Sequence, residues 1–190
     1  MIASKAAMNF SSNLRRMLWF ALCLTVLVNP SLSQKANPIT TIILVRHAEK
    51  DTVGADPALT KAGVDRSLAL ANLFGNSGIS TIYVTQFRRT QQTAEPLASR
   101  LHVKPVVFSV DLSSPRRYAN DLANEIIAKW SGSTLLVSNH SNIIPLIIDA
   151  LGAGSTTTID DHIYDDVFVV LRDSSGSAKL LKLKYGNPSH

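Results

Sequence analysis

Histidine and arginine side chains follow several short apolar runs of the sequence. They are Arg46, His47, Arg88, Arg89 and His140. Planar guanidinium groups bind phosphate oxygens through paired hydrogen bonds. A neutral imidazole can accept a phosphoryl group on one ring nitrogen. If the fold brings these side chains together, their types predict phosphate chemistry.

The elements that must position these residues are strands of one sheet. Short, continuous apolar runs typical of buried strands occupy residues 42–45, 79–84, 106–108 and 135–137. Helical patterns occupy residues 60–74, 89–101, 115–130 and 141–151. The last two runs, residues 167–171 and 178–183, predict a hairpin. This succession predicts an α/β fold, a three-layer αβα sandwich whose central sheet is mostly parallel and ends in a C-terminal hairpin.

Ligands of open parallel sheets bind beyond the carboxyl ends of the strands. Besides the histidines and arginines, this edge should carry Glu49 after the first strand and Asp111 after the third. Ser141 and Asn142 follow His140, and a helix beginning at Ser141 would direct free backbone N–H groups at an anion. We expect Arg88, Ser141 and Asn142 to be substrate contacts.

Three segments carry a family resemblance. LVRHAE at residues 44–49, TQFRRTQQTA at 85–94 and VSNHSN at 137–142 resemble, in order and spacing, the phosphoglycerate-mutase-like histidine phosphatase superfamily. The resemblance implies that His47 is a nucleophile that forms a phosphohistidine and that water then accepts the phosphoryl group. It further implies that Arg46, Arg89 and His140 bind and stabilise this group. No metal or other cofactor is required, because the arginines supply the positive charge.

The departing alkoxide also needs a proton. Many members of the family place a glutamate after the third strand, in a Glu-x-x-x-Gly setting. This sequence has Asp111 there without the glycine, and Thr85-Gln86 replaces the usual Ser-Pro before the second arginine motif. Asp111 is the first candidate for the general acid and Glu49 the second. Either one would need a pKa raised toward neutrality by burial or by a neighbouring anion.

Alternative functions stay open beside a phosphatase. A binding or sensor protein of the same fold would keep the phosphate pocket and lack turnover. A mutase is less favoured, because the 190 − 33 = 157 residues after the leader leave little room for a lid over the intermediate. The acidic run 160–166 could be a metal site, although a solvated loop is the preferred interpretation. The natural substrate and the oligomeric state are not determined by the sequence.

The first 33 residues have the three parts of a secretory signal peptide. Lys5, Arg15 and Arg16 precede the apolar run 17–28, and Ser31-Leu32-Ser33 forms a small-residue cleavage site. The run is short for a hydrocarbon core of about 30 Å, and an uncleaved anchor is the alternative. We expect residues 34–190 to form one exported domain, periplasmic or secreted, without stable membrane association.

The charge and the cysteine content of the sequence limit the classes of partner and of active site that we expect. The formal charge of +5 falls to +2 without the three basic residues of the leader, because 19 − 3 = 16 basic residues face 14 acidic ones. The sequence contains no basic helix of the kind that binds nucleic acid. A small-molecule phosphate ester is therefore the expected partner. The only cysteine, Cys23, lies in the leader. A cysteine nucleophile and a cysteine zinc site are therefore excluded from the mature domain.

Overall fold

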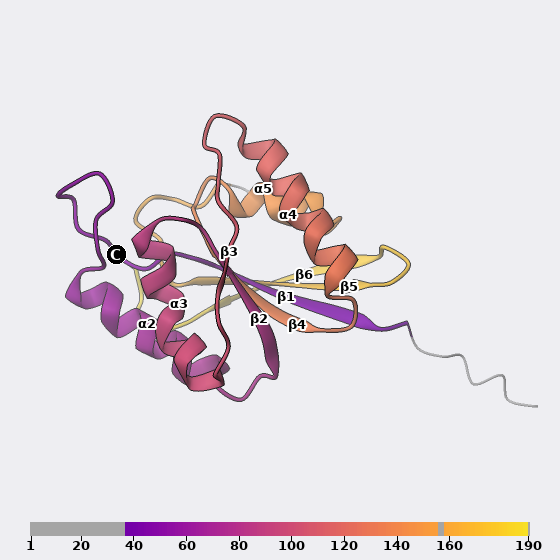
Figure 1. Ribbon diagram of the computed structural model, residues 1–190, viewed down its shortest axis with the longest axis horizontal. Helices are drawn as coiled ribbons and strands as arrows, with labels where there is room; N and C mark the ends of the chain where they lie inside the picture. The colour runs from indigo at the N-terminus through magenta and orange to yellow at the C-terminus, as the bar shows by residue number, and fades with distance from the viewer. Residues whose placement is uncertain (1–36, 156–157, 190) are drawn as a thin grey trace, which may run out of the picture. The chain divides into compact units, whose positions relative to one another are not determined.

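A six-stranded sheet is the middle layer of the computed structural model, which describes residues 37–155 and 158–189 (Figure 1). The strands are β1 (Ile39–Arg46), β2 (Ile79–Val84), β3 (Val106–Val107), β4 (Thr134–Asn139), β5 (Asp166–Asp173) and β6 (Ala178–Lys184). They lie in the order β3-β2-β4-β1-β5-β6. The first four strands run parallel, and β5 and β6 form an antiparallel hairpin beside β1. The predicted sheet, mostly parallel with a closing hairpin, is confirmed.

Helices cover both faces of this sheet. They are α2 (Lys61–Phe74), α3 (Arg88–Leu101), α4 (Pro115–Lys129) and α5 (Ile144–Ala150). Helices α2 and α3 pack with one face of the sheet, and α4 and α5 lie on the other (Figure 1). Successive residues of β1 alternate between the two cores: Ile42 packs with the α4 side, whereas Ile43 packs with the α2 side. This alternation is the period of two expected of a strand buried on both faces.

The start of α2 brings that helix close to the segment after β1. The Thr60 hydroxyl accepts a hydrogen bond from the N–H of Gly63 and caps the helix. A Cβ at Gly63 would collide with the carbonyl of Glu49. Glycine at this position therefore permits the approach that sets Glu49 against α2.

The predicted helix over residues 141–151 is wrong at its start. Residues 141–143 form a turn, and α5 begins at Ile144 with Pro145 in its first turn. Proline has no N–H to donate, and its ring clashes with a preceding helical turn, so it fits only the first turn. Ser141 is thus not the first residue of a helix, and the argument for an anion site at that helix end does not hold.

The run 106–108 is not a buried strand. Only two of its residues pair, at the edge of the sheet beside β2, and the side chains of Val106 and Val107 are 41% and 52% exposed. Phe108 packs against the core that contains α4. An apolar run alone does not distinguish an edge strand from a central one.

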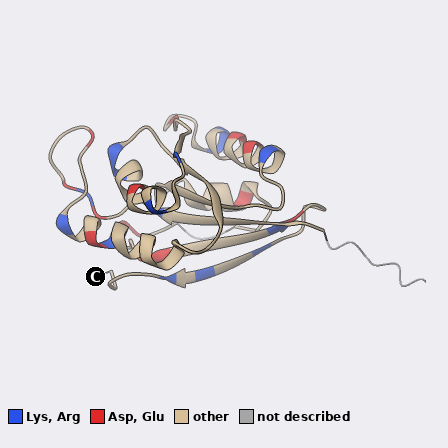
Figure 2. Ribbon diagram, turned by 60° about the horizontal axis from the view of Figure 1, so that its bottom comes forward, with Lys and Arg blue, Asp and Glu red and all other residues tan. Residues whose placement is uncertain are grey.

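Charged residues of both signs alternate along the outer faces of the helices (Figure 2). Several form ion pairs one turn apart, including Lys61 with Asp65 in α2 and Lys129 with Glu125 in α4. None of the described helices has the length and apolarity needed to cross a membrane. The leader predicted over residues 1–33 lies outside the described residues.

Candidate active site

His47 directly follows β1 and is buried. Its backbone N–H donates to the carbonyl of Asn139 at 2.8 Å, and its Nδ1 lies 2.9 Å from the carbonyl of Ala48. A carbonyl only accepts, so Nδ1 carries the ring proton and Nε2 keeps its lone pair. Burial, with smaller contributions from the charges of Arg46 and Arg89, lowers the pKa of His47 to about 3. His47 is therefore a neutral imidazole with a free Nε2 at ordinary pH.

His140 follows β4 and faces His47. The centroids of the two rings lie 5.5 Å apart with the planes 65° to one another. His140 Nε2 lies 3.3 Å from the Thr85 hydroxyl, which is itself 2.9 Å from the hydroxyl of Thr90. Burial, and then the neighbouring His47, lowers the pKa of His140 to about 3. Thr85, which the sequence marked only as a departure from the family pattern, thus contacts the second histidine.

Arg46 is held by the segment between α5 and β5. Its Nη1 donates to the carbonyls of Asp160 and Asp161, both at 2.9 Å, and of Ile163 at 3.1 Å. The ring of Tyr164 lies 4.2 Å from the guanidinium carbon. The side chains of Asp160, Asp161 and His162 are exposed, as expected of a solvated loop, and the carbonyls of this loop also fix Arg46. Within residues 37–155 and 158–189, no group of three potential ligands is placed to hold a metal ion.

Arg89 lies in the first turn of α3. Its guanidinium stacks on the ring of Phe87 at 4.3 Å, and its Nη1 lies 3.7 Å from the Asp56 carboxylate. Desolvation by burial lowers the pKa of Arg89, although an arginine remains charged. The Nε atoms of Arg46 and Arg89 are both buried without a hydrogen-bond partner within the protein. Buried donors of this kind need an acceptor, and an anion between the two guanidinium groups would supply one.

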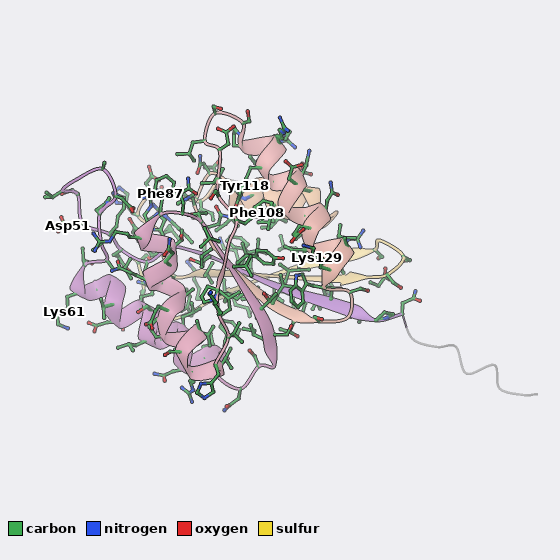
Figure 3. All side chains as sticks on the ribbon, in the orientation of Figure 1. Asp51, Lys61, Phe87, Phe108, Tyr118 and Lys129 are labelled. Carbon is green, nitrogen blue, oxygen red and sulfur yellow. The ribbon has the colours of Figure 1, made fainter. Side chains whose placement is uncertain are left out.

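One residue ties the two histidines together through the backbone. The main-chain carbonyl of Asn139 accepts from His47, and its side-chain oxygen accepts from the N–H of His140 at 2.9 Å. The Asn139 amide donates to the Tyr118 hydroxyl at 2.9 Å, and that hydroxyl contacts the Phe108 carbonyl at 3.3 Å (Figure 3 labels Tyr118 and Phe108). Neither Asn139 nor Tyr118 was among the predicted site residues. The only sequence signal for this support is the asparagine that directly precedes His140.

The two predicted acids lack the environment that the role requires. Glu49 accepts from Nε and Nη2 of Arg66 at 2.7–3.0 Å, so its carboxylate is fixed in an ion pair. Asp111 is exposed, and hydrogen bonds from the hydroxyl and N–H of Ser113 lower its pKa. A general acid needs the opposite shift. Asp111 therefore lacks the raised pKa that the role requires, and the carboxylate of Glu49 is occupied by Arg66.

The predicted substrate contacts lie around this arrangement. Ser141 is half-buried, and its hydroxyl is 3.4 Å from the Asp161 carboxylate. Arg88 and Asn142 are exposed. The backbone N–H of Arg88 donates to both carboxylate oxygens of Asp56 at 3.1 Å. Arg46, His47, Arg89 and His140 thus form the interior of the site, and the three predicted contacts lie at its edge.

Residues 42–113 match the family model of the histidine phosphatase superfamily, branch 1. The matched stretch contains the end of β1 with Arg46 and His47 and the first turn of α3 with Arg89. Over this stretch the chain is similar to the histidine phosphatase superfamily. None of the curated proteins matches the sequence.

Solved structures of histidine phosphatases share this fold. The protein histidine phosphatase SixA, complexed with tungstate, is 21% identical, with a TM-score of 0.54 over 76% of this chain and 96% of SixA. A mycobacterial glucosyl-3-phosphoglycerate phosphatase, complexed with inorganic phosphate, is 14% identical, with a TM-score of 0.55 over 78% of this chain and 97% of that one. A mutant phosphoserine phosphatase from Entamoeba histolytica, complexed with phosphoserine, is also 14% identical, with a TM-score of 0.56 over 77% and 96%. At these identities the likeness establishes the fold of this chain and no more.

The two buried histidines predict how the stability of this protein depends on pH. In the unfolded chain a histidine takes up its proton as the pH falls through about 6.5, whereas His47 and His140 do so only near 3. The unfolded state therefore binds more protons between these values, so the free energy of unfolding decreases as the pH falls from about 6.5 to about 3. Urea titrations at pH 7 and pH 4.5 measure this loss.

The variant His140→Asn isolates the contribution of one histidine to that loss. It should lose less stability between pH 7 and pH 4.5 than the unmodified protein. The exposed residue His102 provides the matched control, because His102→Asn should leave the loss unchanged. Equal losses in the His140 variant and the unmodified protein would contradict the assignment of a neutral, buried His140.

Proposed function

We propose that the chain is a phosphomonoesterase that acts through a phosphohistidine on His47 and requires no metal. One arrangement carries the proposal: a neutral His47 with a free Nε2 lies beside His140 and two guanidinium groups whose buried Nε donors lack partners. Such a site combines a nucleophile with a preformed positive environment for three phosphoryl oxygens.

The mechanism follows from these positions. Arg46 and Arg89 bind the oxygens of the phosphate monoester and bring the phosphorus in line with His47 Nε2. The imidazole attacks through Nε2, while its proton stays on Nδ1 and is donated in a hydrogen bond to the Ala48 carbonyl. His140 and the arginines stabilise the charge of the equatorial oxygens as the bond to the leaving group breaks. Water then attacks the phosphorus of the phosphohistidine and releases inorganic phosphate.

The substrate is proposed only as a chemical class, a small phosphate ester. The structural neighbours hold tungstate, inorganic phosphate or phosphoserine, and we infer a small phosphate ester as the substrate of this chain too. The second candidate function is a phosphate-binding or sensor protein without turnover, and the settings of Asp111 and Glu49 favour it over a mutase. From the leader we further propose that the domain is exported to the periplasm or secreted.

Hydrolysis of a chromogenic aryl phosphate by the purified protein tests the proposal. Aryl leaving groups hardly need protonation, so turnover should not depend on a general acid. We expect hydrolysis that persists when a chelator is present. Turnover that stops with the chelator and returns with an added divalent metal would overturn metal independence. Tight binding of phosphate or vanadate without any hydrolysis would instead establish the binding protein.

A further inference from the structure

All 14 acidic residues of the sequence lie within the described residues, because residues 1–36, 156–157 and 190 contain no aspartate or glutamate. The search for a proton donor can therefore cover every carboxyl side chain. Two carboxylates form ion pairs with the guanidinium groups of the site. These are Asp56, at 3.7 Å from Arg89, and Asp161, at 3.6 Å from Arg46.

Asp56 has a structural role that occupies its carboxylate. Both of its oxygens accept from the N–H of Arg88, the first residue of α3. The residue at the N-cap position, Phe87, offers no side-chain cap, so Asp56 satisfies this helix end from a distant loop. The N-terminus of a helix favours a negative charge, and a carboxylate held there is stabilised in its ionised form.

The carboxylate of Asp161, unlike that of Asp56, is not occupied by a helix end. Its backbone is fixed, because its carbonyl accepts from Arg46 Nη1 at 2.9 Å. Its side chain is 86% exposed, and the nearest partners of the carboxylate are Arg46 Nη2 at 3.6 Å and the Ser141 hydroxyl at 3.4 Å. Both contacts are long for a charge-assisted hydrogen bond. The carboxyl group can therefore exchange a proton with solvent while it stays beside the arginine that binds phosphate.

We propose that Asp161 is the general acid that protonates the leaving group, an inference that rests on the proposed phosphatase activity. As His47 Nε2 bonds to phosphorus, the bond from phosphorus to the ester oxygen breaks, and the Asp161 proton passes to that oxygen to release an alcohol. The resulting carboxylate takes a proton from the water that attacks the phosphohistidine. Inorganic phosphate leaves, and both His47 and the Asp161 carboxyl return to their starting forms.

A phosphate dianion bound by Arg46 would lie close to the Asp161 carboxyl group, because that group is 3.6 Å from Arg46 Nη2. The neighbouring titratable side chains on this segment are Asp160 and His162, and both are exposed. The role of Asp161 is thus inferred from its position beside the arginine that would bind phosphate.

The test compares two leaving groups in Asp161→Asn. For an alkyl phosphate we expect kcat to fall by about 10²-fold or more, the usual contribution of a general acid. For an aryl phosphate the loss should stay below about threefold, because that leaving group hardly needs a proton. Asp51→Asn is the matched control, since this exposed side chain accepts hydrogen bonds from the N–H groups of Thr52 and Val53 that asparagine can keep. This control should retain activity on both substrates.

Each other outcome overturns the inference. Equal losses on both substrates would assign Asp161 a structural role through Arg46, and an unchanged alkyl rate would exclude it as the acid. A selective alkyl loss in Asp111→Asn or Glu49→Gln, in place of Asp161→Asn, would move the role to that residue. An unmodified protein that cleaves only aryl phosphates would show that no acid operates. Failure of the unmodified protein on aryl phosphates is a separate result, which refutes the phosphatase proposal itself.

Discussion

Replacement of His47 by alanine is expected to reduce kcat for aryl phosphate hydrolysis by at least about 10⁴-fold, the scale on which nucleophile removal acts in covalent catalysis. The reason is geometric as well as chemical. His140, the other histidine of the site, has its Nε2 against Thr85, so it is not free to replace His47 as nucleophile. Steady-state rates of purified unmodified and variant protein at equal concentration measure the effect.

Two further observations separate loss of the nucleophile from loss of the fold. The variant should unfold at a denaturant concentration close to that of the unmodified protein, and His102→Asn should keep full activity because His102 is exposed. A radiolabelled substrate quenched in base, where phosphohistidine persists, should label the unmodified protein and leave the His47 variant unlabelled. Label that survives in the variant would place the phosphoryl group on another residue.

Replacement of Arg66 by alanine is expected to cost about 3–5 kcal/mol of unfolding free energy, the range for breaking a buried ion pair. The side chain of Arg66 is only 4% exposed and that of Glu49 is 22% exposed. Arg66 also donates to the carbonyls of Tyr185 and Asn187. The variant leaves all three acceptors without this donor. At about 2–4 °C per kcal/mol for a domain of this size, the melting temperature should fall by about 6–20 °C.

An exposed ion pair on the same helix is the control for Arg66. Lys61 pairs with Asp65 at 2.9 Å, and the side chain of Lys61 is 90% exposed. Lys61→Ala should change the unfolding free energy by no more than about 0.5 kcal/mol. If the two variants melted at similar temperatures, the Glu49–Arg66 pair would contribute no more to the unfolding free energy than an exposed pair. Glu49 would then again be a candidate for the general acid.

The sequence predicted the fold because its signals are local. Apolar runs of strand length and the Thr60 cap of α2 depend on neighbouring residues. The sequence also predicted which histidines and arginines meet, because the ends of parallel strands share one edge of a sheet. It did not predict the strand order, in which β1 pairs with β4, or the exposed edge position of β3, because these depend on contacts between distant segments. The start of α5 required knowledge of what Pro145 excludes.

The surroundings of the site depend on contacts that no local pattern encodes. Arg46 is bound by carbonyls 114–117 residues further along the chain, and a carbonyl is available at every residue whatever its side chain. The sequence placed Glu49 near the nucleophile as a candidate acid, but it did not show that Arg66 of α2 forms an ion pair with it. Asp161 was hidden within an acidic run whose composition suggested solvent or a metal. The sequence predicted which residues the structure brings together better than which residues support them.

The position of β1 in the sheet has a consequence for how the protein is made. β1 lies between β4 and β5, so Thr41 pairs with Thr134 on one side and with Leu171 on the other. A ribosome synthesises most of the chain before the first strand can find either neighbour, and pairings so distant in sequence form slowly. During that delay the central strand of the sheet lacks its partners. A chain that folds late is suited to translocation through a channel that accepts only unfolded protein, and this fits the export that we propose from its leader.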